Sequence, residues 1–495
     1  MSDSSRTIMA IDQGTTSSRA ILFSQSGRLL KQQNQEFEQL FPHDGWVEHR
    51  PDEIWQSTLD VSRAMVAYGD EINQPVMAIG ITNQRETTLI WDRATGEVIY
   101  NAIVWQDRRT AAICEALQKD GHLETVSSRS GLLLDPYFSA TKVAWILDNV
   151  EGARARAEAG ELCFGTVDSF VIWQLTGGKN HLTDATNASR TNLYNINEGR
   201  WDETLCALFN VPLSMLPEVR DCASDFGETD PDLFGRAIPI CGVAGDQQAA
   251  TIGQACFAEG AIKSTYGTGC FMLANTGQNR LHSQNKLLST VAYQIDGKTT
   301  YGLEGSIFIS GAIIQWLRDG LRILDDAKDS EPMAAGLDSN EGVYMVPALT
   351  GLGAPHWAPH VRGAIYGITR DTGPAHFARA ALESVAYQTF DLIEAMRGDG
   401  IECEGLKVDG GMVANDWLMQ FMADILDRQV ARPVVAETTA LGVAMLAMLQ
   451  MGAAHSLEDM AQMWQLDAEF TPQMRDDKRQ DLLSGWQTAI NRTLS

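Results

Sequence analysis

The sequence lacks two features of secreted and redox-active proteins. None of its eight cysteines is spaced as C-x-x-C, which excludes the usual zinc-ribbon and thioredoxin-type motifs. The first residues lead directly into an apolar segment and contain no signal-peptide hydrophobic region. Scattered cysteines without a secretion signal are typical of buried thiols in a reducing compartment. We therefore expect a cytoplasmic protein whose cysteines are buried.

Excess positive charge and long apolar runs are also missing. The 495 residues include 38 lysines and arginines against 64 aspartates and glutamates, which gives a formal net charge of −26. This balance disfavours non-specific binding to nucleic acid or to an anionic membrane. The longest uncharged apolar stretch, residues 440–454, is interrupted by Gly442, Gln450 and Gly452 and predicts a buried helix rather than a membrane span. We expect no nucleic-acid partner and no membrane insertion.

Signature motifs of several enzyme classes are absent. Gly177-Gly178-Lys179 is followed by Asn180, so the sequence has no P-loop of the form G-x-x-x-x-G-K-[ST]. No G-x-G-x-x-G opens a helix after a predicted strand, which argues against a Rossmann dehydrogenase. There is also no G-x-S-x-G nucleophile elbow and no H-E-x-x-H zinc motif. A nucleotide site in this chain must therefore be built differently.

The most informative segment that is present is a polar turn near the N-terminus. Residues 8–11 and 20–23 are apolar, and residues 12–19 (DQGTTSSR) between them predict strand, tight turn, strand. Gly14 lets the backbone approach a ligand closely, and hydroxyl side chains with the charge of Arg19 suit phosphate oxygens. Asp12, at the end of the first strand, can hold Mg²⁺ directly or through water. The alternative is a surface hairpin turn rich in small polar residues.

A second segment of this kind lies near mid-chain. Residues 261–273 (AIKSTYGTGCFML) again predict strand, glycine- and threonine-rich turn, strand. A chain of 495 residues is too long for one core, and the two hairpins suggest two related α/β domains that face a cleft. We place these domains at residues 1–253 and 254–495. Apolar patterns predict further strands at 76–82, 238–243 and 406–408 and helices at 376–396, 415–426 and 438–449.

Charged residues follow two of the predicted strands. Asp246 comes after the strand at 238–243, where a carboxylate can accept a proton or orient a hydroxyl group. A helix-capping role is the alternative for this residue. Arg85 and Glu86 come after the strand at 76–82 and can bind a polyol, because arginine donates hydrogen bonds and glutamate accepts them. A solvated surface ion pair is the alternative there.

Glycines and aromatic residues complete the candidate site. Gly410 and Gly411 follow the strand at 406–408, and Asn415 can cap the next helix. This arrangement lets backbone lie against a planar or phosphorylated ligand, although a plain strand-to-helix turn has the same pattern. Aromatic faces near the polar segments can pack the C–H edge of a small polyol or fill the core, and these are Trp105, Tyr137 and Phe271.

Together these segments resemble the FGGY family of carbohydrate kinases, and the resemblance covers nearly the whole chain. The motifs that carry it are residues 12–19, 83–87 (NQRET), 137–146 (YFSATKVAWI), 244–248 (AGDQQ), 266–271 (YGTGCF), 363–368 (GAIYGI), 376–383 and 408–411 (VDGG). The resemblance implies an α/β fold of two actin-like (ribonuclease-H-like) ATPase domains that flank a central cleft. It also implies transfer of the γ-phosphoryl group of MgATP to glycerol in glycerol catabolism, with sn-glycerol 3-phosphate and ADP as products.

The resemblance also implies roles for individual residues. Asp246 is expected to be the catalytic base and Asp12 the carboxylate on the magnesium side. The residues expected to bind glycerol are Arg85, Glu86, Trp105, Tyr137, Asp246, Gln247 and Phe271. The residues expected to bind ATP are Thr15, Thr16, Ser17 and Arg19 at the phosphates, with Thr268, Gly311, Gln315, Gly411 and Asn415. Family members commonly form dimers or tetramers, so the resemblance implies a homodimer or homotetramer.

Two regulatory features of some family members are missing from this chain. Residues 230–236 (DPDLFGR), which are acidic and bulky, stand where a glycine-rich basic loop binds fructose 1,6-bisphosphate. No histidine occurs between His181 and His282, the region in which other members are activated by histidine phosphorylation. Two alternatives stay open. One is a kinase of the same family that acts on a pentulose or longer polyol, and the other is an actin-like nucleotide-binding protein that moves or assembles.

Overall fold

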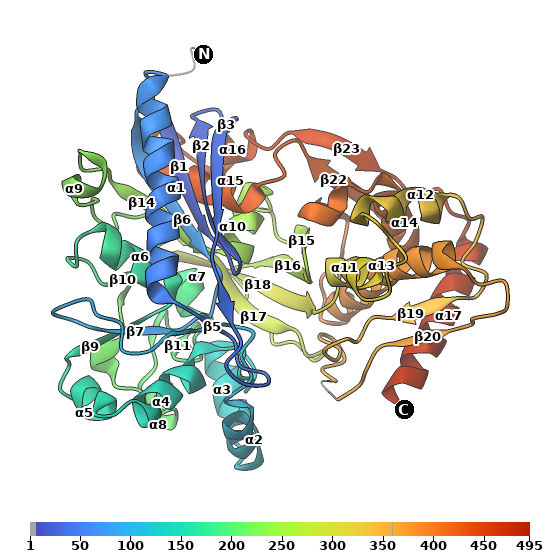
Figure 1. The fold of residues 1–495 in the computed structure, drawn as a ribbon, viewed down its shortest axis with the longest axis horizontal. Helices are drawn as coiled ribbons and strands as arrows, with labels where there is room; N and C mark the ends of the chain where they lie inside the picture. The colour runs from blue at the N-terminus through green and yellow to red at the C-terminus, as the bar shows by residue number, and fades with distance from the viewer. Residues whose placement is uncertain (1–5, 359) are drawn as a thin grey trace.

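The computed structural model describes residues 6–358 and 360–495, which form two lobes, each built around one sheet (Figure 1). Along the first sheet the strands are β14 (Ile240–Gly245), β6 (Val76–Asn83), β1 (Thr7–Gln13), β2 (Ser17–Ser24) and β3 (Leu29–Glu36). β1 pairs antiparallel with β2 and parallel with β6. The hairpin predicted at the N-terminus is therefore confirmed.

The second sheet repeats this arrangement. Along it the strands are β17 (Leu288–Ile295), β18 (Lys298–Ile307), β16 (Cys270–Gly277), β15 (Ile262–Tyr266), β21 (Gly405–Asp409), β22 (Gln429–Pro433) and β23 (Leu466–Phe470). β15 pairs antiparallel with β16 and parallel with β21, as β1 does with β2 and β6. The hairpin predicted near mid-chain is confirmed, and each lobe turns a glycine-containing hairpin at the same position of its sheet.

Helices cover the sheets and fill the segments between strands. Those of the first lobe and its extensions are α1 (Pro51–Glu71), α2 (Ala111–Lys119), α3 (Leu123–Ser130), α4 (Ser139–Asn149), α5 (Ala153–Glu158), α6 (Val167–Leu175), α7 (Ala185–Ala188), α8 (Glu203–Leu208), α9 (Pro231–Phe234) and α10 (Asp246–Gly253). Later helices are α11 (Gly311–Asp319), α12 (Ser330–Ala335), α13 (Pro374–Gly398), α14 (Asp416–Leu426), α15 (Thr438–Gln450), α16 (Leu457–Ala461) and α17 (Asp476–Leu494). The helices predicted at 376–396, 415–426 and 438–449 are thus confirmed as α13, α14 and α15.

The remaining elements are short. The strands are β4 (Gln39–Leu40), β5 (Glu48–His49), β7 (Leu89–Asp92), β8 (Ala102–Ile103), β9 (Leu162–Gly165), β10 (Leu182–Asp184), β11 (Tyr194–Asn195), β12 (Arg200–Trp201), β13 (Glu218–Arg220), β19 (Tyr344–Val346) and β20 (Ala364–Tyr366). Single 3₁₀ turns are η1 (Leu213–Met215), η2 (Ala327–Asp329) and η3 (Gly411–Ala414). Many of these pieces lie below the first sheet in Figure 1, where they extend the first lobe.

Two helices join the lobes. α10 follows the first sheet, and α15, from the C-terminal part of the chain, packs against α10 and on β1, β6 and β14. Glycines permit the close approach: a Cβ on Gly442 would lie 1.9 Å from the carbonyl oxygen of Ala249, and one on Gly80 would lie 2.3 Å from that of Val443. The buried helix predicted within 440–454 is confirmed, and no described helix is long and apolar enough to cross a membrane.

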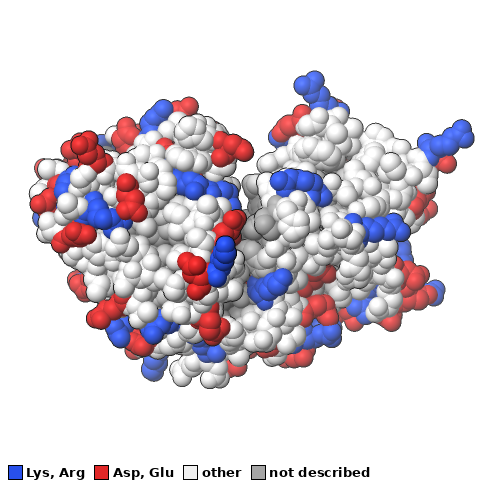
Figure 2. Space-filling model, turned by 90° about the horizontal axis from the view of Figure 1, so that it is seen from below, with Lys and Arg blue, Asp and Glu red and all other residues white. Residues whose placement is uncertain are grey.

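A cleft separates the lobes on the face shown in Figure 2, where acidic and basic side chains alternate over both lobes. The N-terminus of α10 directly follows β14 of the first sheet. All eight cysteines are buried and free, as predicted. Polar groups of the two lobes gather where the lobes meet, since Arg85 of the first lobe bonds Glu304 of the second.

Candidate active site

The first hairpin ends in a two-residue turn, Thr15 and Thr16. The backbone N–H of Gly14 donates to the carbonyl of Ser17 (2.9 Å) and closes this turn. Thr16 is exposed, and the half-buried hydroxyl of Thr15 accepts a hydrogen bond from Trp105 Nε1 (2.9 Å). The turn therefore presents hydroxyls and backbone amides at its tip, which is a suitable environment for phosphate oxygens.

Asp12 and Arg19 are partners in the register of β1 and β2, directly below this turn. Arg19 forms an ion pair with Glu437, the residue before α15. Burial raises the pKa of Asp12 to about 7, Arg19 opposes this shift, and the carboxylates of Glu437 and Asp246 add to it. The ionised form of Asp12 is therefore disfavoured in this structure, and a cation placed beside it would favour ionisation.

The chemistry of Asp12 fits a hydrated Mg²⁺. A carboxylate is a hard oxygen ligand, and Mg²⁺ usually keeps several waters and binds substrate phosphates in addition to one or two carboxylates. Within the described residues, no group of three histidine, cysteine, aspartate or glutamate side chains is arranged to hold a metal ion. The protein alone therefore offers an incomplete coordination shell, which phosphate and water would complete.

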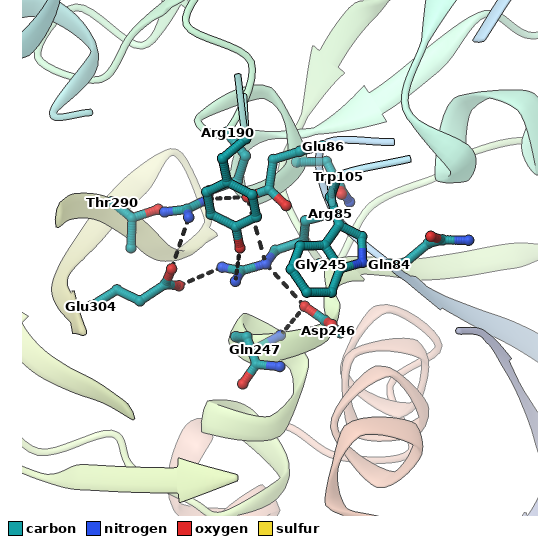
Figure 3. Close-up of polar contacts among 12 residues, drawn as sticks. Gln84, Arg85, Glu86, Trp105, Arg190, Gly245, Asp246, Gln247, Thr290 and Glu304 are labelled. Carbon is teal, nitrogen blue, oxygen red and sulfur yellow. Dashed lines mark hydrogen bonds and ion pairs between the residues drawn. The ribbon is translucent and has the colours of Figure 1, made fainter. Parts of the chain in front are cut away.

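Arg85 and Glu86 are almost completely buried, with 2% and 1% of their side chains exposed, so they are not the solvated surface pair considered as an alternative. Arg85 Nε lies 2.9 Å from Asp246 Oδ1, as Figure 3 shows. Arg85 Nη2 donates to the hydroxyl of Tyr137 (3.4 Å). The side chain of Asp246 is 33% exposed. The structure therefore joins three residues expected at the polyol site, with Asp246 on the open side.

Two residues that the sequence analysis missed complete this cluster. Arg190 Nε donates to Glu86 Oε1 (2.7 Å), and Arg190 Nη2 donates to Glu304 Oε1 (2.8 Å). The other oxygen of Glu304 accepts from Arg85 Nη1 (2.5 Å), and Arg85 Nε lies 3.9 Å from Glu86 Oε1. The two arginines and two glutamates therefore form a closed ring of ion pairs (Figure 3). Glu304 is the one acidic residue of β18 and stands among apolar residues and glycines, so the sequence pattern could have marked it as a candidate site residue. No local pattern marks Arg190 in this way.

The ring distributes charge unevenly. Burial raises the pKa of Glu304, but Arg190 and Arg85 outweigh burial and hold this pKa below its ordinary value. Burial raises the pKa of Glu86 above its ordinary value in spite of the same two arginines. With Asp246 included, three carboxylates face two guanidinium groups, so the cluster retains hydrogen-bond acceptors for neutral hydroxyl groups.

Aromatic rings from three segments stand beside Arg85. The ring centroid of Trp105 lies 5.6 Å from that of Tyr137 and 6.1 Å from that of Phe271, in edge-to-face geometry. The guanidinium carbon of Arg85 lies 6.0 Å from the centre of the Phe271 ring. All three rings are half-buried rather than enclosed in the core. They form an apolar wall on one side of the charged cluster.

Asp246 and Gln247 begin α10, whose N-cap is Gly245. Asp246 therefore does not cap the helix, although the N–H of Gln247 donates to its Oδ1 (2.7 Å) and the positive end of the helix favours its negative charge. Gln247 Oε1 accepts from Lys263 Nζ (2.5 Å), a buried lysine of β15 that the sequence analysis did not single out. Lys263 of the second sheet thus holds the side chain of Gln247, which is next to Asp246 on the open side of the cluster.

Gln84 connects this cluster to the first hairpin. Its Nε2 donates to Gln13 Oε1 (3.0 Å) and to the carbonyl of Gly14 (3.1 Å), and its backbone N–H donates to the carbonyl of Gln13 (2.7 Å). Gln84 immediately precedes the Arg85–Glu86 pair, and the sequence analysis predicted no separate role for it. The candidate phosphate segment and the candidate polyol segment are therefore one hydrogen-bonded unit.

The residues expected at the nucleotide surround the second hairpin. The N–H groups of Gly311 and Ala312 donate to the carbonyls of Gly267 (2.9 Å) and Thr268 (3.0 Å), which seats α11 on the turn. A Cβ on Gly311 would lie 2.6 Å from the carbonyl oxygen of Gly267, so glycine is required there for packing. Gln315 is exposed on α11 and contacts none of the other predicted nucleotide residues through a hydrogen bond.

Gly410 and Gly411 differ in their surroundings. Gly410 has φ +93°, and a Cβ on it would lie 2.4 Å from the carbonyl oxygen of Tyr266, whereas a Cβ on Gly411 would meet no atom within 4 Å. Asn415 caps α14 through its Oδ1, which accepts from the N–H of Leu418 (2.8 Å), as predicted. The open space is therefore at Gly411, next to the second hairpin.

These features define a sugar-kinase type of site, and sequence comparison agrees. Sequence models of the N-terminal and C-terminal domains of the FGGY family of carbohydrate kinases match residues 7–253 and 262–451. The chain therefore belongs to this family. It is 60% identical over 488 residues to a glycerol kinase from Rhodospirillum centenum, a match that covers 99% of this chain and 98% of the relative. It is 58% identical over 488 residues to glycerol kinase 1 from Pseudomonas aeruginosa, with 99% of both chains covered.

Solved structures agree with the fold. The crystal structure of Plasmodium falciparum glycerol kinase with ADP has a TM-score of 0.93 and 37% identity and covers 99% of this chain and 98% of its own. A ligand-bound xylulose kinase from Lactobacillus acidophilus has a TM-score of 0.89 at 19% identity, with 99% of both chains covered, and shares the fold. The predicted actin-like pair of α/β domains around a cleft is confirmed. The division at residue 253 and the roles of individual residues stay predictions.

Proposed function

We propose that this chain is an enzyme that phosphorylates glycerol with ATP to give sn-glycerol 3-phosphate and ADP. The relatives that are 58–60% identical over almost the whole chain are glycerol kinases, and a structure at 37% identity holds ADP. The observation that carries the proposal is the buried Arg85–Glu86 pair beside a wall of aromatic rings, with Asp246 at its open edge. Such a pocket matches a short neutral polyol: its hydroxyls find donors and acceptors, and its carbons find apolar faces.

Each residue of the pocket has a distinct task. Arg85 donates to one hydroxyl of glycerol and Glu86 accepts from the next, which fixes two of the three hydroxyls. Trp105 and Phe271 pack against the carbon chain, while Tyr137 and Gln247 add polar contacts. Asp246 orients the third hydroxyl and takes its proton as the oxygen attacks the γ-phosphorus, and the P–O bond to ADP breaks.

The first hairpin and the second hairpin hold the nucleotide. Thr15, Thr16, Ser17 and Arg19 contact the phosphates, and Arg19 meets the charge that develops during transfer. Mg²⁺ bound with ATP would supply charge neutralisation to the phosphates, and Asp12 is the residue that would hold it, directly or through water. The residues proposed for the remainder of ATP are Thr268, Gly311, Gln315, Gly411 and Asn415.

Three further parts of the proposal concern organisation. The domains are residues 1–253 and 254–495, with α15 of the second domain crossing onto the sheet of the first. A cytoplasmic location is part of the proposal, and the use of ATP and the buried free thiols support it. A homodimer or homotetramer is proposed because members of the family commonly form dimers or tetramers. Sedimentation of the purified protein would give the mass of the assembly and so test this proposal.

The deciding experiment is an ADP-release assay over a panel of polyols. We expect the highest kcat/KM for glycerol, with xylulose, ribulose and erythritol well below it. Preference for a pentulose would replace glycerol as the substrate, and slow phosphate release independent of any polyol would instead indicate an actin-like protein that does not phosphorylate a metabolite. Asp246→Asn is the variant control: its kcat should fall by roughly 100-fold or more, and normal turnover would refute the role of Asp246.

A further inference from the structure

The backbone of Glu86 is held in an unusual conformation. Its φ is +60°, a backbone angle that residues other than glycine rarely adopt. The N–H of Thr87 donates to the carbonyl of Arg85 (2.7 Å), so the three residues form a γ-turn with Glu86 at its centre. Such a conformation persists only when the surroundings impose it. The direction of the Glu86 carboxylate therefore depends on whatever holds this turn.

The turn is held through the carbonyl oxygen of Glu86. Three side chains donate hydrogen bonds to it: Thr88 Oγ1 (3.1 Å), Ser139 Oγ (3.0 Å) and Lys142 Nζ (3.3 Å). Thr88 follows the turn directly, whereas Ser139 and Lys142 come from the first turns of α4. The helix α4 therefore holds the backbone of the γ-turn, while the Glu86 carboxylate bonds Arg190.

Lys142 also holds a second residue of the pocket. Its Nζ donates to the carbonyl of Tyr137 (2.7 Å), and among the described residues it forms no ion pair. Its side chain is completely buried, and burial lowers its pKa to about 8, an effect that nearby Glu86 and Asp107 oppose. Burying an ammonium group is costly unless its hydrogen bonds are satisfied. Two of the three N–H donors of Lys142 bond the carbonyls of Glu86 and Tyr137, two residues proposed to bind the substrate.

We propose that Lys142 is a positioning residue that sets the separation of Glu86 and Tyr137 and thereby the affinity for the polyol. The two residues come from separate segments, the turn after β6 and the segment before α4, and the ammonium group of Lys142 bonds the backbone of both. Among the described residues, Lys142 donates no hydrogen bond to either hairpin, and its two hydrogen-bond partners are the carbonyls of Glu86 and Tyr137. The inference rests on the proposed function, because it assumes that Glu86 and Tyr137 bind the phosphoryl acceptor.

The test compares three variants on α4. Lys142→Met removes the ammonium group and keeps the length of the side chain, and Ser139→Ala removes a neutral donor from the same Glu86 carbonyl. Thr141→Val is the matched control, since Thr141 is buried on the same helix but bonds Thr110 Oγ1 (2.8 Å) and the Cys114 thiol rather than the carbonyl of Glu86 or of Tyr137. Steady-state kinetics give KM for glycerol, KM for ATP and kcat, and melting curves report folding.

Lys142→Met should raise KM for glycerol roughly 10-fold to 100-fold, the equivalent of one or two charged hydrogen bonds. KM for ATP should stay within about twofold, because the hairpins are untouched. Ser139→Ala should raise KM for glycerol roughly threefold to tenfold, as expected for a neutral hydrogen bond, and Thr141→Val should leave both KM values unchanged. This split between substrates separates positioning from general loss of structure, which would weaken both sites.

An unchanged KM for glycerol in folded Lys142→Met overturns the proposal, as does an equal rise in both KM values. If Lys142→Met does not fold, Ser139→Ala decides: no rise in its KM for glycerol overturns the proposal. The wild-type polyol panel is measured first, so the two proposals fail separately. Preference for another polyol defeats glycerol as the substrate, and Lys142 is then judged on the KM of that polyol.

Discussion

Glu304 Oε1 lies 2.8 Å from Arg190 Nη2, and no solvent reaches either side chain. Glu304 belongs to β18 of the second sheet, yet its other oxygen bonds Arg85 of the first lobe. Glu304→Gln would remove the carboxylate that pairs with both Arg85 and Arg190, which would leave two buried guanidinium groups with less opposite charge beside them. We expect a loss of about 3 kcal/mol in the free energy of unfolding and a rise of roughly 10-fold to 100-fold in KM for glycerol, because Arg85 loses its orientation.

A buried ion pair far from the site provides the control for this prediction. Glu383 bonds Arg379 Nε (2.7 Å) within α13 and is as well buried as Glu304. Glu383→Gln should also lower the free energy of unfolding while KM for glycerol stays unchanged. Urea denaturation and initial rates measure the two quantities. A KM that changes equally in both variants would show that the Glu304 effect is only structural.

Arg19 is predicted to act on phosphoryl transfer rather than on the polyol. Its one ion pair among the described residues is with Glu437, the residue before α15. Arg19→Ala should lower kcat by roughly 100-fold, since a charge aimed at the transferred group is lost, while KM for glycerol changes little. Arg156→Ala, which removes a surface pair with Asp92, is the control. An unchanged kcat in Arg19→Ala would make the first hairpin a plain polar turn.

Local patterns in the sequence predicted both hairpins, because two apolar runs that are joined by a short polar segment with glycine usually fold as a hairpin. They did not predict that Arg85 and Glu86 are buried, since adjacent opposite charges are usually solvated. The burial depends on Arg190, 104 residues beyond Glu86, and on Glu304, 219 residues beyond Arg85. No spacing rule connects residues so far apart. For the same reason the sequence did not predict that α15, from the C-terminal part of the chain, packs on the first sheet.

The two glycines after β21 should respond in opposite ways to alanine. Gly410→Ala places a methyl group 2.4 Å from the carbonyl oxygen of Tyr266 at φ +93°, so it should lower the melting temperature clearly. Gly411→Ala meets no atom within 4 Å and should leave the melting temperature unchanged. If the nucleotide occupies that space, KM for ATP rises at least severalfold in Gly411→Ala. An unaltered KM for ATP would remove Gly411 from the nucleotide site.

Asp168 gives the protein a predictable pH dependence. Burial, with the nearby Asp184 carboxylate, raises the pKa of Asp168 to about 7, although Thr166 and Thr183 donate hydrogen bonds that oppose the shift. In the unfolded chain the pKa returns to about 3.8. The folded state therefore binds a proton that the unfolded state has released. The resulting stability is complete below pH ~4 and is lost as the pH rises through ~7.

Asp168→Asn removes this titration and should flatten the curve. Between pH 5 and 7 the free energy of unfolding of the wild type should fall, relative to the variant, by up to about 1.4 kcal/mol per pH unit, the value for one proton. Asp232→Asn, at an exposed position on α9, should keep the slope of the wild type. Urea denaturation at each pH measures the difference. Parallel curves for the wild type and Asp168→Asn would mean that Asp168 is ionised in the fold, and that its hydrogen bonds to Thr166 and Thr183 outweigh burial.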